Sequence, residues 1–297
     1  MTTASGNGRG VALMSLGFFC FSASDTLTKV LATAAVHPVQ IVWARQAGLV
    51  FVVLFIAMRT GPKILRTHYP MLQIARGALA VMAPLCFAIA FAFVPLAEGI
   101  AVTFIAPLIV IALSAFFLGE SVTPKQWLAT LIGLAGALVI VRPGAGLFHP
   151  TIVLAFCAAT LFATRQVMGR VLARKDNAVT TMAFTALVGF ALLSVALPFV
   201  WETPPSTSMA VTFVAMALFA AFGEICTIRA VEIASAATVA PMQYTTILWA
   251  TFFGWFAFNQ LPDRWTWVGT AIIVASGIYI IRSATAGQTP PPIGTVR

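Results

Sequence analysis

Long apolar runs separated by short polar breaks make up almost the whole chain. The runs are about 17 to 24 residues long, which is the length that an α-helix needs to cross the hydrocarbon core of a bilayer. Segments in lipid must satisfy their own backbone hydrogen bonds, and these runs lack the period-two alternation of a membrane β-barrel. The pattern therefore predicts an all-α membrane protein with ten transmembrane helices. They span residues 10–32, 39–58, 71–93, 98–118, 126–142, 150–170, 180–200, 207–229, 234–257 and 265–282.

Composition supports lipid as the solvent of this fold. Of the 297 residues, 60% are hydrophobic and 8% are charged, whereas a soluble domain carries roughly 25% charged residues. The four cysteines all lie within apolar runs, so neither a disulfide framework nor a metal site is expected. No phosphate-binding loop, HExxH or GxSxG motif occurs. We therefore expect no catalytic residues, no metal, no cofactor and no use of ATP.

The net charge of +9 is explained by orientation in the membrane rather than by nucleic-acid binding. With a cytoplasmic N-terminus, twelve Lys and Arg residues lie at the inner ends of the predicted helices and three lie at the outer ends. Cytoplasmic loops carry the positive excess in membrane proteins. The pattern predicts a bacterial inner-membrane protein with both termini in the cytoplasm. The three outer charges are Lys29, Arg142 and Arg264.

A shift of 140 residues superimposes the first five runs on the last five. It places Trp127 on Trp267 and Cys86 on Cys226. Because five is odd, a duplicated five-helix unit enters the membrane the second time from the opposite side. Such an inverted repeat suits alternating access to a site near the bilayer midplane. The predicted units are residues 1–145, residues 146–284 and a disordered cytoplasmic tail at 285–297.

Several motifs in the first half resemble a known family. They are Arg76-Gly77, Pro84, Val94-Pro95-Leu96-Ala97-Glu98, Pro107, Leu118-Gly119-Glu120, Trp127, Gly133, Gly136 and Arg142-Pro143-Gly144. This set resembles the EamA module of the drug/metabolite transporter superfamily. The resemblance implies two EamA modules with a substrate cavity between them. It also implies export of amino acids, including aromatic ones, as in YddG-type exporters. S-adenosylmethionine, nucleobase derivatives, vitamins and cationic drugs remain alternative substrates, because Gly119-Glu120 is replaced by Asn259-Gln260 in the second half.

Four ionisable residues lie inside predicted helices, where each costs roughly 2.5 to 3.5 kcal/mol to insert. Asp25 and Arg45 lie at a similar depth on the outer side, and Arg165 and Glu224 lie at a similar depth on the inner side. We predict two opposite-charge couples that act as gates or as contacts for a zwitterionic substrate. The alternative is that they are structural ion pairs that only hold helices in register.

Polar and aromatic residues on the same helices are further candidates for the cavity lining. At the 140-residue offset, Thr103 and Phe104 coincide with Gln243 and Tyr244, which suits an amphipathic substrate with a ring. Packing in the core or against lipid is the alternative for each of them. The remaining cavity candidates are Ser22, Trp43, Gln166 and Trp249. Prolines within predicted helices are candidate hinges or simply tolerated bends, and these are Pro84, Pro107 and Pro241, with Pro198 as a further bend.

The expected partners are a small-molecule substrate and the lipid bilayer. Facilitated diffusion, exchange and proton antiport remain open, and antiport would require Asp25 or Glu224 to titrate. Small residues such as Gly133 and Gly269 allow close helix packing, either within a monomer or at a homodimer seam. A channel or a membrane-embedded enzyme is the alternative from another class.

Overall fold

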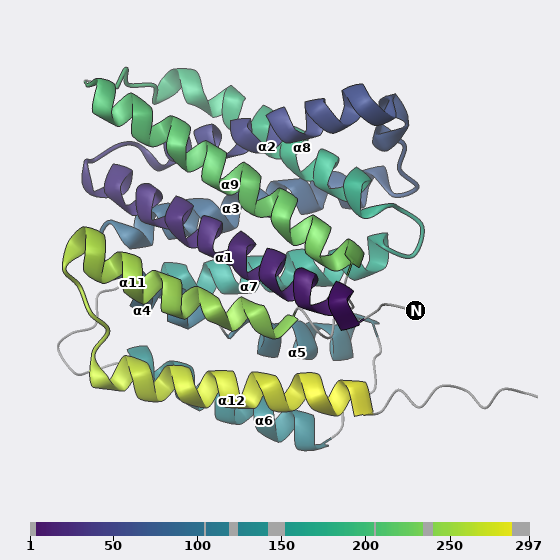
Figure 1. Cartoon of the computed structure of the whole chain (residues 1–297), viewed down its shortest axis with the longest axis vertical. Coiled ribbons are helices and arrows are strands. Elements are labelled where there is room, and N and C mark those ends of the chain that lie inside the picture. The colour runs from purple at the N-terminus through teal and green to yellow at the C-terminus, as the bar shows by residue number, and fades with distance from the viewer. Residues whose placement is uncertain are drawn as a thin grey trace, which may run out of the picture.

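A bundle of packed helices forms the protein in the computed structural model, which describes residues 4–103, 105–118, 124–141, 152–204, 206–233 and 240–286 (Figure 1). All regular structure in these residues is helical. The α-helices are α1 (Ala4–Thr33), α2 (Pro38–Thr60), α3 (Pro70–Phe91), α4 (Leu96–Thr103), α5 (Ala106–Leu118), α6 (Pro124–Val141), α7 (Ile152–Leu172), α8 (Ala178–Ala196), α9 (Thr207–Ile233), α11 (Thr246–Phe258) and α12 (Arg264–Ala286). The short 3₁₀ helices are η1 (Pro62–Leu65), η2 (Leu197–Phe199) and η3 (Ala240–Thr245).

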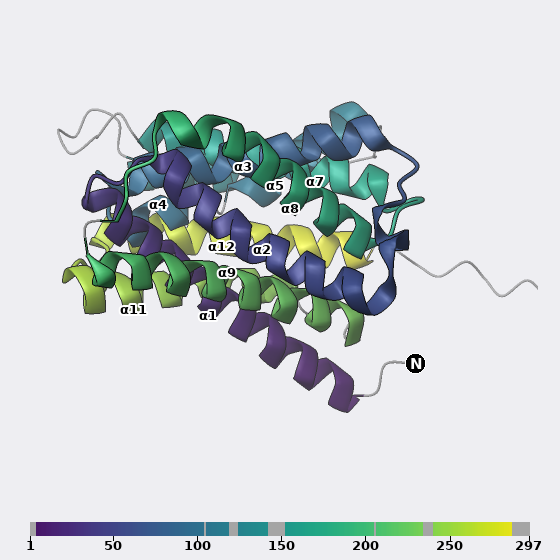
Figure 2. The ribbon, with the colours of Figure 1, turned by 90° about the horizontal axis from the view of Figure 1, so that it is seen from above.

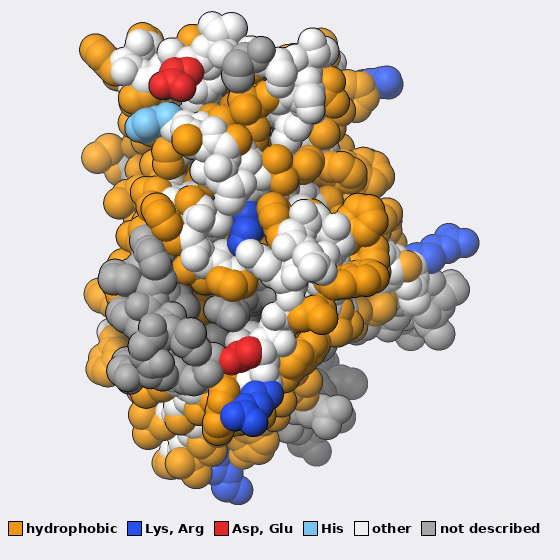
Figure 3. Space-filling view, turned by 90° about the vertical axis from the view of Figure 1, so that its left-hand side faces the viewer, with side chains coloured by type: hydrophobic (Ala, Val, Ile, Leu, Met, Phe, Trp, Pro, Cys, Tyr) orange, Lys and Arg blue, Asp and Glu red, His pale blue; other side chains and the backbone are white. Residues whose placement is uncertain are grey.

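The helices are long and apolar, as the pattern of the sequence predicts. Five segments are long and apolar enough to cross a membrane by themselves. Large apolar side chains also lie exposed on the outside of the bundle, including Phe51, Met58 and Phe116. Hydrophobic side chains dominate the flanks in the space-filling view (Figure 3). An exposed apolar surface of this extent fits contact with lipid. The five segments are Gly8–Thr33, Pro38–Thr60, Pro70–Phe91, Ala178–Phe199 and Thr207–Ala230.

Two of the predicted helices are broken near their middles, which the apolar pattern did not reveal. The run 98–118 consists of α4 and α5, and the run 234–257 contains η3 followed by α11. Pro107 and Pro241 therefore lie at the start of α5 and within η3, and not inside continuous α-helices as predicted. Proline cannot donate the backbone hydrogen bond that would continue the preceding turn. Pro84 does lie inside α3, as expected, and Pro198 lies in η2.

The two breaks occur at equivalent places in the two halves. The helices after the breaks, α5 and α11, begin at Ala106 and Thr246 and end at Leu118 and Phe258, so they are offset by 140 residues at both ends. Helices α2 and α8 begin with the same offset, at Pro38 and Ala178. The helix boundaries thus follow the spacing that the sequence repeat predicts.

Contacts between the halves come in matched pairs. Helix α1 packs on α9 as α7 packs on α3, and α2 packs on α9 as α8 packs on α3. Helices α2 and α8 contact each other, as do α6 and α12 at the far end of the bundle (Figures 1 and 2). The first described residues, at the start of α1, and the last, at the end of α12, both lie on the right-hand side of the bundle in Figure 1. Exchanging the halves maps these contacts onto one another, although the contact between α2 and α3 has no equally close counterpart between α8 and α9.

Two glycines show this exchange at the level of single residues. A Cβ on Gly48 of α2 would overlap the backbone oxygen of Ala217 on α9. A Cβ on Gly77 of α3 would lie 2.7 Å from Cβ of Val188 on α8. The two contacts are equivalent under the 140-residue offset, because Gly48 corresponds to Val188 and Gly77 to Ala217. Glycine allows the close helix approach in each case.

A buried carboxylate clamps two connections at the end of the bundle where α7 ends. Asp176, between α7 and α8, has a fully buried side chain. It accepts hydrogen bonds from the backbone N–H of His68 at 2.9 Å, from Nε2 of Gln73 at 2.9 Å and from the hydroxyl of Thr67, and it contacts Nδ1 of His68 at 3.1 Å. Burial by itself would raise the pKa of Asp176, but these hydrogen bonds outweigh it and hold the pKa well below its usual range.

Replacing Asp176 with Asn is expected to lower the thermal unfolding midpoint of the detergent-solubilised protein by about 3 to 8 °C at pH 7, because charge-assisted hydrogen bonds contribute roughly 1.5 to 3 kcal/mol each. A carboxyl with a depressed pKa stabilises the fold above its unfolded pKa of about 3.9, and this contribution disappears as the pH falls through its folded pKa. The deficit should therefore persist from pH 8 to 5 and shrink only in strong acid. Glu202→Gln, a change at an exposed loop carboxylate, serves as the control. Equal midpoints for Asp176→Asn and the control would contradict the clamp.

Candidate functional site

An ion pair joins α1 and α2 at the centre of the bundle. Nη1 of Arg45 lies 2.6 Å from Oδ1 of Asp25, and the two side chains are 21% and 22% exposed. Asp25 lies eight residues before the end of α1, and Arg45 lies seven residues after the start of α2. At 1.5 Å per residue the pair is therefore about 10 to 12 Å from the helix ends. The structure brings together the two residues that were expected to pair.

The second predicted couple belongs to the same charged cluster. Arg165 on α7 interacts electrostatically with Glu224 on α9 and also with Arg45. The guanidinium of Arg165 lies over the ring of Phe162, 5.0 Å from its centroid. Within the described residues, no ion pair within 4 Å joins Arg165 to Glu224. Arg165 and Glu224 therefore interact at longer range and do not form a direct salt bridge.

Arg76 is a member of this cluster that the sequence analysis assigned to an inner helix end. It lies on α3, six residues after Pro70, and interacts electrostatically with both Arg165 and Glu224. Its Nη1 donates a hydrogen bond to the hydroxyl of Thr185 on α8. Its Nε is buried without a hydrogen-bond partner. The position of Arg76 inside the predicted helix 71–93 is the sequence signal for this setting, whereas the charge bias of the helix ends favours the membrane surface.

We use the term central cluster for the charged side chains of Asp25, Arg45, Arg76, Arg165 and Glu224. They come from α1, α2, α3, α7 and α9, so both halves of the chain contribute. Buried charges in a membrane protein require partners or a wet cavity and mark functional sites by default. The central cluster therefore has the location and chemistry of a binding site for a charged small molecule.

Two uncharged candidates, on α1 and α11, also have polar atoms without partners. The hydroxyl of Ser22, one turn before Asp25 on α1, and Nε1 of Trp249 on α11 are both buried and unpaired. The Trp249 ring packs edge-on against Phe19 of α1, with centroids 5.1 Å apart. Buried polar atoms are nearly always hydrogen-bonded in folded proteins. Ser22 and Trp249 are therefore exceptions to this rule within the described residues.

The remaining candidates lie in different settings. Trp43 stacks on Phe190 at 5.2 Å and donates to the hydroxyl of Ser194 at 2.9 Å, so it joins α2 to α8. Gln166 is exposed, and Gln243 in η3 is half-buried. The hydroxyl of Thr103 donates to the carbonyl of Ile100 at the end of α4. Thr103 and Gln243 thus lie next to the two helix breaks. Phe104 lies outside the described residues, and so does the side chain of Tyr244.

Lys29 lies four residues before the end of α1, consistent with the expected place near a helix end, but it is buried. Only 3% of the surface of Lys29 is exposed. Its Nζ donates to the carbonyl of Val94, before α4, at 2.7 Å and to Oε1 of Gln260, after α11, at 3.0 Å. The ammonium also lies 5.0 Å from the ring centroid of Phe258. Lys29 lies one helical turn beyond Asp25 and links connections from both halves of the chain.

Replacing Lys29 with Met keeps the volume of the side chain but removes both hydrogen bonds. Because each buried group left unpaired costs about 1 to 3 kcal/mol, we expect the unfolding midpoint in detergent to fall by at least about 3 °C. Arg264→Met removes an exposed cation from the start of α12 and is the matched control. A melting curve of Lys29→Met that coincides with that of the control would show that the buried ammonium contributes nothing.

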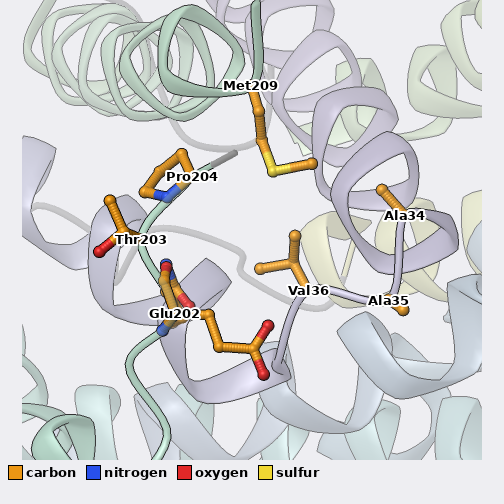
Figure 4. Close-up of a pocket in the computed structure, with 8 residues that line it drawn as sticks. Ala34, Ala35, Val36, Glu202, Thr203, Pro204 and Met209 are labelled. Atoms are coloured by element: carbon orange, nitrogen blue, oxygen red, sulfur yellow. Dashed lines mark hydrogen bonds between the residues drawn. The ribbon is translucent and has the colours of Figure 1, made fainter. Parts of the chain in front are cut away.

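Two cavities lie away from the central cluster. One, of about 80 Å³, lies between the α1–α2 and α8–α9 connections, with Val36, Pro204 and Met209 around it and Glu202 at its side (Figure 4). The other, of about 430 Å³, is an almost wholly apolar groove between α6 and α12. Neither has the charges that a zwitterion requires.

The sequence pattern of the EamA-like transporter family matches residues 8–142 and 149–282. The chain belongs to this family. Both halves match it, although only the first half carried the motifs that made the resemblance visible. The family membership agrees with the long apolar helices and with a charged cluster built from both halves.

Three bacterial transporters align with 76 to 92% of the chain. An S-adenosylmethionine uptake transporter of Rickettsia conorii is 27% identical over 280 residues, 92% of each chain. The pseudopaline exporter CntI of Pseudomonas aeruginosa is 27% identical over 278 residues, covering 92% of this chain and 96% of the exporter. A riboflavin transporter of Brucella anthropi is 28% identical over 230 residues, 76% and 81% of the two chains. These relatives carry different small molecules, so the family does not specify a substrate.

A solved structure titled only "Crystal structure of protein" has the same fold. It superimposes with a TM-score of 0.65 at 21% identity and covers 94% of this chain and 99% of its own. At this identity the likeness concerns the fold alone.

Proposed function

We propose that this EamA family member is a secondary transporter, and not an enzyme, that moves a small amphipathic zwitterion by alternating access. The observation that carries the proposal is the central cluster, in which opposite charges from five helices and both halves lie about 9 Å or more from the helix ends. Charges at this depth are expensive unless they serve a substrate or ion pathway. The transporter relatives support the same function.

The proposed mechanism rests on an inverted repeat of residues 1–145 and 146–284, each with five membrane crossings. Its support is the pairing of equivalent contacts, such as Gly48 with Ala217 and Val188 with Gly77. The breaks before α5 and α11 give each half a discontinuous helix, a common feature of midplane binding sites in transporters. An exchange of conformation between the halves would open the central cluster first to one side and then to the other.

We place the protein in a bacterial inner membrane with both termini, and the tail 285–297, in the cytoplasm. The excess of Lys and Arg at the proposed inner helix ends supports this orientation. In this orientation Asp176 ties the halves together on the cytoplasmic side. Lys29 does so on the outer side. Opening either side requires its tie to loosen.

For the substrate we propose amino acids, including aromatic ones, moved outward. S-adenosylmethionine is a second candidate, because uptake transporters named for it align with 92% of the chain. Both candidates carry an α-amino-acid group, whose ammonium and carboxylate match the mixed charges of the central cluster. The unpaired indole of Trp249, which packs on Phe19 of the same helix as Asp25, suits a polar group on an attached ring.

Counterflow in proteoliposomes tests the proposal. Vesicles with the purified protein are loaded with unlabelled tryptophan or S-adenosylmethionine and diluted into a trace of the same labelled compound. A carrier accumulates label transiently above equilibrium, whereas a channel does not. A second series with an imposed pH gradient separates proton antiport from exchange and facilitated diffusion. Absence of counterflow for both compounds, with correctly folded protein, would contradict the proposed function.

A further inference from the structure

We propose that Arg76 and Arg165 form an anion-binding pair that receives the carboxylate of the transported molecule. This inference rests on the proposed function and adds the chemical group that selects the substrate. Arg76 reaches the central cluster from α3 and Arg165 from α7, and the two guanidinium groups interact electrostatically. They lie on two helices that pack directly against each other.

The charge balance of the central cluster leaves these two arginines short of anions. It holds three guanidinium groups and two carboxylates. One carboxylate, Asp25, is already in a direct ion pair with Arg45 at 2.6 Å. Glu224 is then the one described acid that interacts with both Arg76 and Arg165. The other acidic side chains that the structure describes belong to connections, and they are Asp176, Glu202 and Asp263.

Two like charges at this depth repel each other, and an anion between them removes the penalty. The repulsion acts in a low-dielectric environment, where it is much stronger than in water. Arg45 adds to it, because it also interacts unfavourably with Arg165. A carboxylate bound between Arg76 and Arg165 would make the central cluster neutral. A cation would meet a region that already carries positive charge.

The hydrogen-bond geometry of Arg76 points in the same direction. Nη1 is held by the hydroxyl of Thr185, which fixes the plane of the guanidinium. Nε is buried and has no partner. A methyl group on Gly169 of α7, one turn after Arg165, would lie 3.5 Å from this Nε, so the edge of the guanidinium faces α7. A guanidinium edge that presents N–H donors is the usual partner for a bidentate carboxylate.

Glu224 gives the proposed pair its selectivity for zwitterions. Its carboxylate interacts with both arginines, and an ammonium group beside it would be attracted to the same place. An α-amino-acid group carries its carboxylate and ammonium on one carbon and can satisfy both. A purely structural Arg76, which only links α3 to α8 through Thr185, would not distinguish substrates by their carboxylate.

Matched pairs of compounds test the inference. Tryptophan and tryptamine differ only in the carboxylate, as do S-adenosylmethionine and its decarboxylated form. Half-saturation concentrations are measured by counterflow or by competition in proteoliposomes. We expect the half-saturation concentration of the wild-type protein to be at least about tenfold lower for the acid of a pair than for the amine. A factor of ten is the change in affinity that one hydrogen bond to a charged group supplies. Arg76→Gln should lose most of that preference. Its half-saturation concentration for the acid should rise, while that for the amine stays the same. Arg66→Gln, at an exposed residue of the α2–α3 connection, should behave as wild type.

Each outcome separates the inference from the proposed function. Transport of both members of a pair by the wild-type protein with equal half-saturation would keep the transporter and overturn the anion-binding pair, and this result does not depend on whether a variant folds. A preference for the acid that survives both in Arg76→Gln and in Arg165→Gln would also overturn it. Transport of neither member of either pair would overturn the proposed function together with the inference.

Discussion

Breaking the ion pair between Asp25 and Arg45 should abolish transport and destabilise the protein. Asp25→Asn leaves Arg45 without its 2.6 Å partner between α1 and α2, and Arg45→Gln strands the carboxylate in the same way. Removing one partner of a fully buried pair costs about 3 to 5 kcal/mol, because the other charge is left uncompensated, and we expect a smaller cost for this half-buried pair. We expect flux in proteoliposomes below about a tenth of wild type for each single variant. The unfolding midpoint in detergent should fall by roughly 5 to 10 °C.

A charge-exchanged double variant separates stability from function. Asp25→Arg combined with Arg45→Asp restores opposite charges across the same contact. It should recover most of the lost midpoint, since the pair is re-formed. If the pair only holds α1 and α2 in register, flux returns with stability. If Asp25 and Arg45 contact the substrate, flux stays low in a stable protein, which is the result we expect.

Glu224→Gln should reduce transport by more than about tenfold, because it removes the carboxylate that offsets Arg76 and Arg165. No closed ion pair breaks here, so the loss of stability should be smaller than for Asp25→Asn. Flux per folded molecule, corrected by fluorescence size-exclusion chromatography, is the measurement. Glu202→Gln, an acid outside the central cluster, is the matched control.

Wild-type flux in both Asp25→Asn and Glu224→Gln, at equal expression, would leave the central cluster without a functional role. It would support the structural alternative that the sequence analysis left open.

The hydrophobic pattern of the sequence predicts where helices lie, but not how they are interrupted. The length and apolar character of each run show which segments can lie in lipid. Most of the helix boundaries expected from these runs agree with the structure within a few residues. The breaks between α4 and α5 and within the ninth run occur in sequence that stays apolar, so hydropathy does not change there. Pro107 and Pro241 were the only local signals. A proline inside an apolar run is as often a tolerated bend as an end.

The sequence also predicts the contacts of the charged site residues only in part. Asp25 and Arg45 could be paired from sequence, because consecutive antiparallel helices bring equal depths together. The settings of Lys29, Arg76 and Asp176 depend on partners 108 to 231 residues away in the chain, which are Gln260, Thr185 and His68. No local pattern encodes such partners. The bias of positive charge toward helix ends predicts that Lys29 lies near the end of α1, but not that it is buried.

The central claim is that the two halves cross the membrane in opposite directions, so equivalent residues face opposite sides. Arg66 and Ser206 are both exposed, lie in the α2–α3 and α8–α9 connections, and are 140 residues apart. Each is replaced by cysteine in a variant whose four native cysteines are alanine, and intact cells are treated with a membrane-impermeant maleimide. We predict labelling of the cysteine at 206 and protection of the cysteine at 66 until the cells are lysed. Labelling of both positions from outside, or protection of both, would contradict the inverted arrangement and the mechanism built on it.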